Sequence, residues 1–426
     1  MIVHRLRFPQ TPANMVKHSP SPFMEGFFTR ERFGKPQFIA GLLLLAFLGQ
    51  CLWLIDRGLR LHGLDSNELY RVREGLRRWH GQQTPEIRDD LPIHIQQNDG
   101  YDPHHSALEY LITSMPLLVW PEPVQAEQMP YWAWLVRLPY AFFGVVLGAS
   151  LWYVARRLYG NSGGYIALVS YCFSPAILRA SSGWFAEPEV MAAWGAFGAI
   201  FTAIASAHTL YAPREVVWWN WRRILLLGLS MALAIGCQFS LVVVIPLALG
   251  FMLYLAPTRR GAAVVIWAAS CLLAVFLLWA AYFFNLADFM QALHHAHFFP
   301  VSGQAYGIAD AYHLLWSRLG QAGVVLVAAL PLSIVTYSLW RRARYFGNTA
   351  PLLIALLFLT MGLGMPHYPG MGFTLMAVPF LFIFVAGIAS DLLETKQRGL
   401  VWAAVWGVLG ATCLWNFLEL LKVGLS

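Results

Sequence analysis

The amino-acid sequence predicts an all-α polytopic membrane protein, on the evidence of its composition and of the length of its apolar runs. Of the 426 residues, 58% are hydrophobic and only 12% are charged. A soluble globular domain with this composition would lack the polar surface that must face water. Many apolar runs are about 20 residues long, enough for a helix to cross a hydrocarbon core of about 30 Å with its backbone hydrogen bonds satisfied.

Eleven apolar segments are expected to form the spanning helices of one bundle. We divide the long run 223–256 at Cys237 and Gln238. A single crossing there would move every later loop to the other side of the membrane, and the positive-inside rule would then fail. Residues 1–37 are expected to form a cytoplasmic segment, and residues 38–426 the transmembrane domain. The segments are 38–55, 131–154, 162–180, 187–211, 223–237, 239–256, 262–284, 323–340, 350–365, 371–391 and 400–421.

The distribution of Lys and Arg predicts the orientation of these spans. If the N-terminus is cytoplasmic, every loop on that side carries at least two Lys or Arg residues, as the positive-inside rule requires. An odd number of spans then places the C-terminus outside, together with the loops 56–130 and 285–322. Since topology accounts for the net charge of +7, no nucleic-acid partner is expected.

The first outer loop contains an unusual concentration of acidic residues. Nine of the 22 Asp and Glu residues lie between Gly63 and Tyr110. Two amphipathic stretches in this loop, 106–120 and Arg71–Trp79, are expected to form helices in the headgroup region, where Arg side chains are available to lipid phosphates. A membrane protein that gathers its carboxylates in one outer loop is expected to carry out chemistry at that surface.

Four of the acids are candidates for the chemistry. Asp65 and Glu68 share one helix face if a helix starts there, and Glu187 and Glu189 flank Pro188 where the fourth span begins. A carboxylate at a membrane boundary can accept a proton from an acceptor hydroxyl, and such acids are functional candidates. The alternative is that they serve as helix caps and first-turn acids, which favour the helix dipole.

Histidine and arginine residues form the second group of candidates. His104 and His105 close the first outer loop, while His295 and His297 follow the seventh span, so His104 with either of the latter two could bind a divalent metal ion. The alternative is two sets of interfacial side chains that never meet. Arg137, at the outer end of the second span, is a natural phosphate partner or a side chain that snorkels to the surface.

These pieces, in this order, resemble the GT-C glycosyltransferases, and more narrowly the protein O-mannosyltransferase and aminoarabinose-transferase superfamily. The resemblance covers roughly residues 38 to 395. Its motifs are Leu-Asp-Ser-Asn-Glu-Leu-Tyr with Asp65, the run from His104 to Leu108, Arg137-Leu138-Pro139, Glu187-Pro188, and His367-Tyr368 with Pro379. The sequence departs from the family in having Asp65 and Glu68 instead of adjacent acids, and Ser106-Ala107 where prolines are usual.

The resemblance implies a bundle of about 11 transmembrane helices with interfacial helices on the outer face, and an inverting glycosyltransferase. It would transfer a sugar from a polyprenyl-phosphate carrier to a lipid or glycan acceptor, without a nucleotide cofactor. Asp65 would act as the base, with Glu68 and Glu187 as further catalytic candidates. The substrate-binding residues would be Arg137, His105, Glu189, His367 and Tyr368.

Two other functions stay open from the sequence. One is a transporter or flippase of lipid-linked glycans, which predicts polar residues within several spans. The other is a non-catalytic GT-C-like subunit of a membrane complex, which the altered acid pair would fit. In each case the chain is expected in a membrane, and we expect that membrane to be the bacterial inner membrane.

Overall fold

The structure is a computed structural model that describes residues 35–82, 92–120, 129–184, 187–211, 221–299, 308–365, 370–395 and 398–425. The chain divides into a short N-terminal unit, Met1–Ile39, and a large unit, Ala40–Ser426. In the described ranges all the regular structure is helical, so the predicted all-α membrane fold is confirmed.

Seven helices in the described part of the chain are long and apolar enough to cross a membrane. Another candidate is the pair made by α13 (Ile308–Gln321) with η6 (Val325–Ala329) and α14 (Leu330–Leu339), which is bent by 117° between Gln321 and Val325. The seven are α1 (Lys35–His62), α5 (Met129–Cys172), α7 (Glu189–Thr209), α11 (Arg260–Ala280), α15 (Phe346–Gly364), α16 (Phe373–Leu393) and α17 (Arg398–Leu425).

All eleven predicted segments coincide with helices, but the count of eleven spans exceeds the seven or eight found. The predicted spans 131–154 and 162–180 both lie within or beside α5, which is interrupted at Gly160 (φ 73°). The second of them is broken again before α6 (Pro175–Ser181). At 17 residues, α9 (Trp221–Cys237) falls short of a full span, as do η5 (Phe239–Val243) and α10 (Val244–Leu255) together.

The centre of the Ala40–Ser426 unit is formed by α7 and α16. In their most apolar stretches 72% of α7 and 94% of α16 is buried, against 17% of α17, so the first two are surrounded by other helices. Aromatic side chains fill the space between them, with Phe380 stacked on Phe201 at 5.7 Å and tilted against Phe197 at 5.3 Å. Such packing gains dispersion energy that lipid cannot supply equally well.

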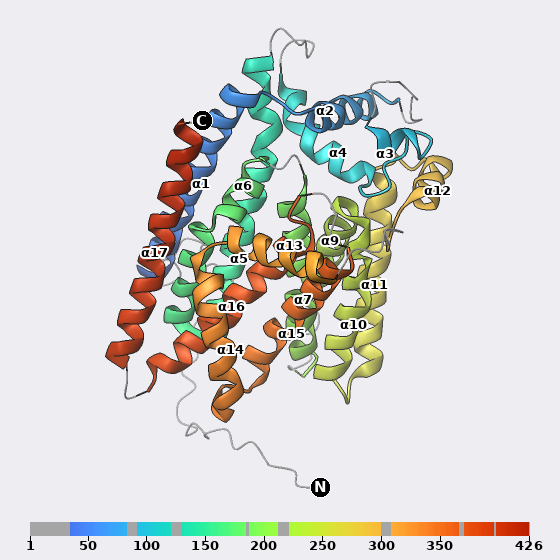
Figure 1. The fold of residues 1–426 in the computed structure, drawn as a ribbon. Coiled ribbons are helices and arrows are strands. Elements are labelled where there is room, and N and C mark those ends of the chain that lie inside the picture. The colour runs from blue at the N-terminus through green and yellow to red at the C-terminus, as the bar shows by residue number, and fades with distance from the viewer. Residues whose placement is uncertain are drawn as a thin grey trace, which may run out of the picture. The chain divides into compact units, whose positions relative to one another are not determined.

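One end of this unit carries a group of short helices (Figure 1). They are α2 (Ser66–Trp79), α3 (Ile93–Gln96), α4 (Ala107–Ser114), η2 (Met115–Val119) and α12 (Leu286–His295). The C-terminal end of α17 lies at the same end as α2 (Figure 1), so the C-terminus and the first predicted outer loop share one side of the bundle.

Backbone hydrogen bonds attach the first predicted outer loop, 56–130, to the break between α9 and η5. Ser106 N–H donates to the Gly236 carbonyl at 2.8 Å, and Phe239 N–H donates to the His104 carbonyl at 2.9 Å. The break at Cys237 and Gln238, which the sequence predicts, therefore has its free backbone groups satisfied by loop residues instead of lipid. These hydrogen bonds hold the loop against the bundle where α9 ends and η5 begins.

Candidate functional site

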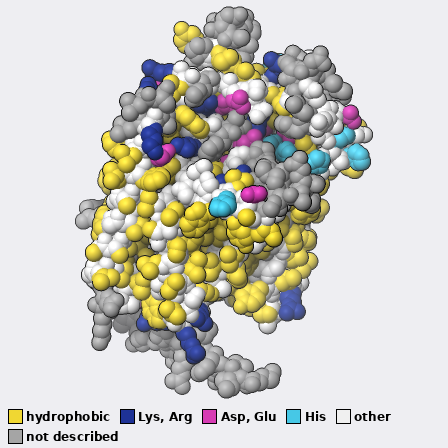
Figure 2. Space-filling view, viewed as in Figure 1, with side chains coloured by type: hydrophobic (Ala, Val, Ile, Leu, Met, Phe, Trp, Pro, Cys, Tyr) yellow, Lys and Arg dark blue, Asp and Glu magenta, His cyan; other side chains and the backbone are white. Residues whose placement is uncertain are grey.

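The buried face of α2 carries charged side chains at helical spacing. Glu68, Arg71, Glu74 and Arg78 are all less than 9% exposed, although the helix lies outside the candidate spans. α2 packs closely on α4, because a Cβ added at Gly75 would overlap the Tyr110 carbonyl oxygen and the Ser114 side chain. Acidic and basic groups gather at this end of the unit above a largely hydrophobic flank, as Figure 2 shows.

Glu68 is held by Arg137, the residue near the start of α5. The guanidinium binds the carboxylate through two hydrogen bonds, Nε to Oε1 and Nη2 to Oε2, both at 2.9 Å. Both side chains are buried. Glu68 Oε2 also accepts the backbone N–H of Asp65 at 3.0 Å, as in a capping box, whereas the Asp65 side chain itself is exposed. Arg137 therefore neither snorkels nor lies far from Asp65.

Arg71, one turn after Glu68, connects α2 with the start of α7. Its Nη2 lies 2.8 Å from Glu187 Oε2, and its Nε lies 3.6 Å from Glu109 Oε1. These contacts correct the expectation that Arg71 faces lipid phosphates: two acids from distant parts of the chain take it into the interior. Arg78 is likewise buried against Glu74 at 2.7 Å.

His105 continues the network from Glu187 to Asp102. Its Nε2 lies 3.3 Å from Glu187 Oε2, and its Nδ1 lies 2.9 Å from Asp102 Oδ2. Asp102 also accepts hydrogen bonds from the backbone N–H groups of His104 and His105 and from the Tyr110 hydroxyl. The imidazole is thus clamped between two carboxylates in a fixed orientation.

The electrostatics of this network follow from its ion pairs. Burial alone would lower the pKa of His105, but Asp102 and Glu187 raise it to about 10, so the imidazole is charged. Burial opposes ionisation of Asp102 and Glu187 too, yet their cationic partners hold both pKa values below the ordinary range. Burial raises the pKa of Glu109, and Arg71 only partly opposes it.

The charge of His105 makes stability depend on pH. Because its folded pKa lies above the ordinary value of about 6.5, its stabilisation is complete below that value and is lost as the pH rises through about 10. We expect the melting temperature of the detergent-solubilised protein to fall between pH 7 and pH 10. The fall should be clearly smaller in His105→Gln, while the exposed control His80→Gln should behave like the wild type; equal slopes for His105→Gln and wild type would contradict this.

Glu189, two residues after Glu187, interacts with a different part of the bundle. It is 3% exposed, and its Oε1 accepts the backbone N–H of Gly372, just before α16. Arg318 of α13 acts on it electrostatically. The start of α7 therefore presents one acid to α2 and the next to α13 and α16.

The histidines meet only in part. The rings of His104 and His297 lie 6.0 Å apart, and the His297 N–H donates to the Pro103 carbonyl at 2.8 Å. His295 instead stacks on Tyr101 at 5.1 Å, and its Nε2 lies 3.5 Å from Asp99. Across the described ranges, no group of three or more His, Cys, Asp or Glu side chains is arranged to hold a metal ion.

A further buried cluster was not anticipated from the sequence. Arg78 Nη1 lies 3.3 Å from Asp288 Oδ2 of α12, the Tyr101 hydroxyl donates to Asp288 Oδ1 at 3.1 Å, and the guanidinium lies over the Tyr282 ring at 5.2 Å. This cluster fastens the second outer loop to the first. The spacing of Glu68, Arg71 and Arg78 on one helix face, around Gly75, was the available signal that α2 is buried on its charged side.

The structure thus brings Asp65, Glu68, Arg137, Arg71 and Glu187 to the same end of the bundle. Asp65 and Glu187 are linked through α2, and His105 and Glu189 adjoin Glu187. The remaining two predicted site residues, His367 and Tyr368, lie outside the described residues.

No protein-family model and no curated protein matches the chain. Among solved structures, the apo oligosaccharyltransferase of Archaeoglobus fulgidus is similar with 14% identity and a TM-score of 0.49, over 88% of this chain and 55% of that one. The oligosaccharyltransferase AglB of the same organism, in complex with an inhibitory peptide and a dolichol-phosphate, gives 13% identity and 0.49, over 90% and 56%. The A. fulgidus enzyme with Zn and sulfate gives 12% and 0.44, over 74% and 44%.

The chain therefore spans about half the length of the solved structures that it matches. Because the TM-scores lie below 0.5, the function proposed below rests on the residues of this chain.

Proposed function

We propose that this chain is a GT-C-type membrane glycosyltransferase that moves a sugar from a polyprenyl-phosphate carrier to a hydroxyl of a lipid or glycan acceptor. The observation that carries the proposal is the buried Glu68–Arg137 pair directly beside the exposed Asp65, at the end of the membrane bundle. Burying ion pairs costs free energy, so they are weak devices for stability and good indications of function.

Arg137 suits the phosphate of such a donor. A guanidinium is a planar fork that pairs with phosphate oxygens and stays charged at any physiological pH. In the described part of the chain its Nη1 is buried and has no hydrogen-bond acceptor, whereas Nε and Nη2 are occupied by Glu68. A cation positioned by Glu68 in this way would stabilise the negative charge that develops on the leaving phosphate.

Asp65 suits the role of general base because its carboxylate is accessible. Glu68 and Glu187 are both buried in ion pairs, while the Asp65 side chain is exposed and is joined to Arg137 through Glu68. In the proposed reaction the acceptor oxygen attacks the anomeric carbon and gives its proton to Asp65. The bond from that carbon to the phosphate oxygen breaks, and the polyprenyl phosphate departs with the electron pair, so the configuration inverts.

The neighbouring network acts as a support in this proposal. Arg71 and His105 hold Glu187 in its ionised form between α2 and α7, and Asp102 orients His105. A rigid framework of this kind is what an electrostatic site needs, because misplacement of charges by about 1 Å lowers rates considerably. We assign these residues a positioning role.

The proposal is tested by transfer assays in proteoliposomes that contain the purified protein and a radiolabelled polyprenyl-phosphate sugar. We expect transfer by the wild type and about a tenfold higher KM for the donor in Arg137→Lys, because a point charge replaces a bidentate fork. The control is Arg179→Lys, which alters a partly exposed ion pair with Glu419 (2.8 Å) that includes none of the proposed site residues, and it should leave KM unchanged.

Three outcomes would count against the proposal. Donor binding without any transfer would favour a non-catalytic subunit, and movement of labelled lipid between leaflets without transfer would favour a flippase. If the KM of Arg137→Lys for the donor equals that of Arg179→Lys, Arg137 does not bind the donor phosphate.

A further inference from the structure

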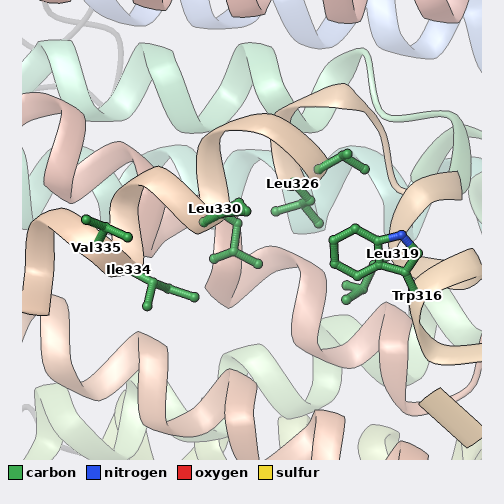
Figure 3. A pocket seen from close by; sticks show the side chains of 8 residues that line it. Trp316, Leu319, Leu326, Leu330, Ile334 and Val335 are labelled. Atoms are coloured by element: carbon green, nitrogen blue, oxygen red, sulfur yellow. The ribbon is translucent and has the colours of Figure 1, made fainter. Parts of the chain in front are cut away.

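Two interiors of opposite character occur in the described part of the chain. Figure 3 shows the first, an apolar cavity of about 350 Å³ at the bend between α13 and η6, with walls that include Leu326 and Leu330. The second lies where α2 and α4 meet the start of α7, and its walls carry full charges. Buried charge costs free energy unless an opposite charge compensates it, so the second interior should be close to electrically neutral.

The charges around Arg71 include one acid too many. The two cations are Arg71 and His105, and the acids that contact them are Asp102, Glu187 and Glu109. Each of these five side chains is at most 9% exposed. Two positive and three negative charges would leave a net charge of −1, so neutrality among the described residues requires that one of the acids hold a proton.

The adjoining charges of α2 are balanced among themselves and do not supply the missing positive charge. Each acid there has its own guanidinium, in the pairs Glu68 with Arg137, Glu74 with Arg77, and Asp288 with Arg78.

Other groups also face Glu109 and bring no cation. Tyr140 of α5 and Cys237 of α9 both interact with it electrostatically, as does Tyr110 of its own helix. Tyrosine and cysteine side chains ordinarily titrate above pH 7 and are then neutral. The charge of Glu109 therefore has to be met by Arg71 or by a proton.

The contacts of the three acids identify Glu109 as the one that holds the proton. Glu187 lies 2.8 Å from Arg71, and Asp102 lies 2.9 Å from His105. Glu109 is 3.6 Å from Arg71, which is too far for a hydrogen bond. Its Oε2 atom is buried without a hydrogen-bond partner among the described residues. Burial raises the pKa of Glu109, and Arg71 only partly opposes this.

We infer that Glu109 is a buried proton-binding site, and that the proton it holds leaves Arg71 to pair with Glu187. Without that proton two carboxylates would compete for one guanidinium. In the described part of the chain Arg71 Nη1 is buried and has no hydrogen-bond acceptor, so the guanidinium has a donor to offer an ionised Glu109. Glu109 is thus a positioning residue that acts through Arg71 on the contact between α2 and the start of α7.

The test compares two isosteric substitutions around the same guanidinium, in the whole protein in nanodiscs at pH 7. Glu109→Gln replaces a neutral acid by a neutral amide, so the melting temperature should fall by about 2 °C or less. Glu187→Gln removes an ionised partner and should lower it by about 6 °C or more. A fall for Glu109→Gln as large as that for Glu187→Gln would show that Glu109 is ionised and would overturn the inference.

Infrared spectroscopy detects the proton itself and needs only the Glu109→Gln variant to fold. The difference spectrum between wild type and Glu109→Gln at pH 7 should contain the C=O stretch of a protonated carboxylic acid, shifted in D₂O. The control Glu419→Gln, which alters the partly exposed pair with Arg179, should leave that band in place. Carboxylate stretches in the Glu109→Gln difference spectrum, in place of the acid band, would mean that a bound cation or nothing at all compensates Glu109, and would exclude the proton site. Because neither measurement needs turnover, the proton site and the proposed sugar transfer can fail separately.

Discussion

Asp65→Asn is expected to lower sugar transfer by about 10²–10⁴-fold, the usual cost of losing a general base. The substitution keeps the size of the side chain, and Asn caps a helix about as well as Asp does, so α2 should still begin at Ser66. The measurement is the initial rate of transfer in proteoliposomes, together with the melting temperature to establish that the fold persists.

The matched control for this prediction is Asp56→Asn. Asp56 is a partly exposed acid on α1 that pairs with Arg60 at 2.9 Å, so its loss should leave the rate nearly unchanged. If Asp65→Asn transfers sugar at a rate close to that of the control, the role of base passes to another acid, with Glu189 the next to examine.

The largest effect on stability is expected from Arg71→Met. Removing one partner of a buried ion pair leaves uncompensated charge in the interior and typically costs about 3–5 kcal/mol. Here Glu187 would lose its 2.8 Å contact with Arg71, and Glu109 its contact at 3.6 Å. The free energy of unfolding in mixed detergent micelles is the quantity to measure.

Arg73→Met, two residues away on the exposed side of α2, provides the control and should change stability by about 0.5 kcal/mol or less. The double variant Arg71→Met with Glu187→Gln should recover part of the loss, because the pair is then removed together and the two effects are not additive. A cost for Arg71→Met no greater than that of Arg73→Met would mean that the ion pair is not formed.

The helical framework was predictable because hydropathy dictates it. A run of apolar residues can satisfy its backbone in lipid only as a helix, and all eleven predicted segments are helical. The break after Cys237 was also predictable, from the alternation of sides that charged loops demand. The bend between α13 and η6 was not, since it depends on a long-range hydrogen bond from Ser174 as well as on Gly323.

The site was predictable in its members but not in their pairing. Asp65, Glu68, Glu187 and Arg137 are visible as polar residues at the ends of apolar runs. The partner of Arg137 is 69 residues away and that of Arg71 is 116 residues away. Which acid meets which guanidinium depends on how the helices pack, so local sequence patterns could not assign Arg71 to Glu187 instead of lipid.

These long separations have a consequence for biogenesis. At a synthesis rate of about 5–20 residues per second, Glu187 emerges from the ribosome about 6–23 s after Arg71. Asp288, the second partner of Arg78 beside Glu74, follows that residue by 210 positions, or about 11–42 s. Throughout this interval the first outer loop must stay hydrated, because burying an unpaired Arg or Glu away from water costs too much free energy. Maturation of the loop therefore waits for membrane insertion of the helices that bring its counter-charges.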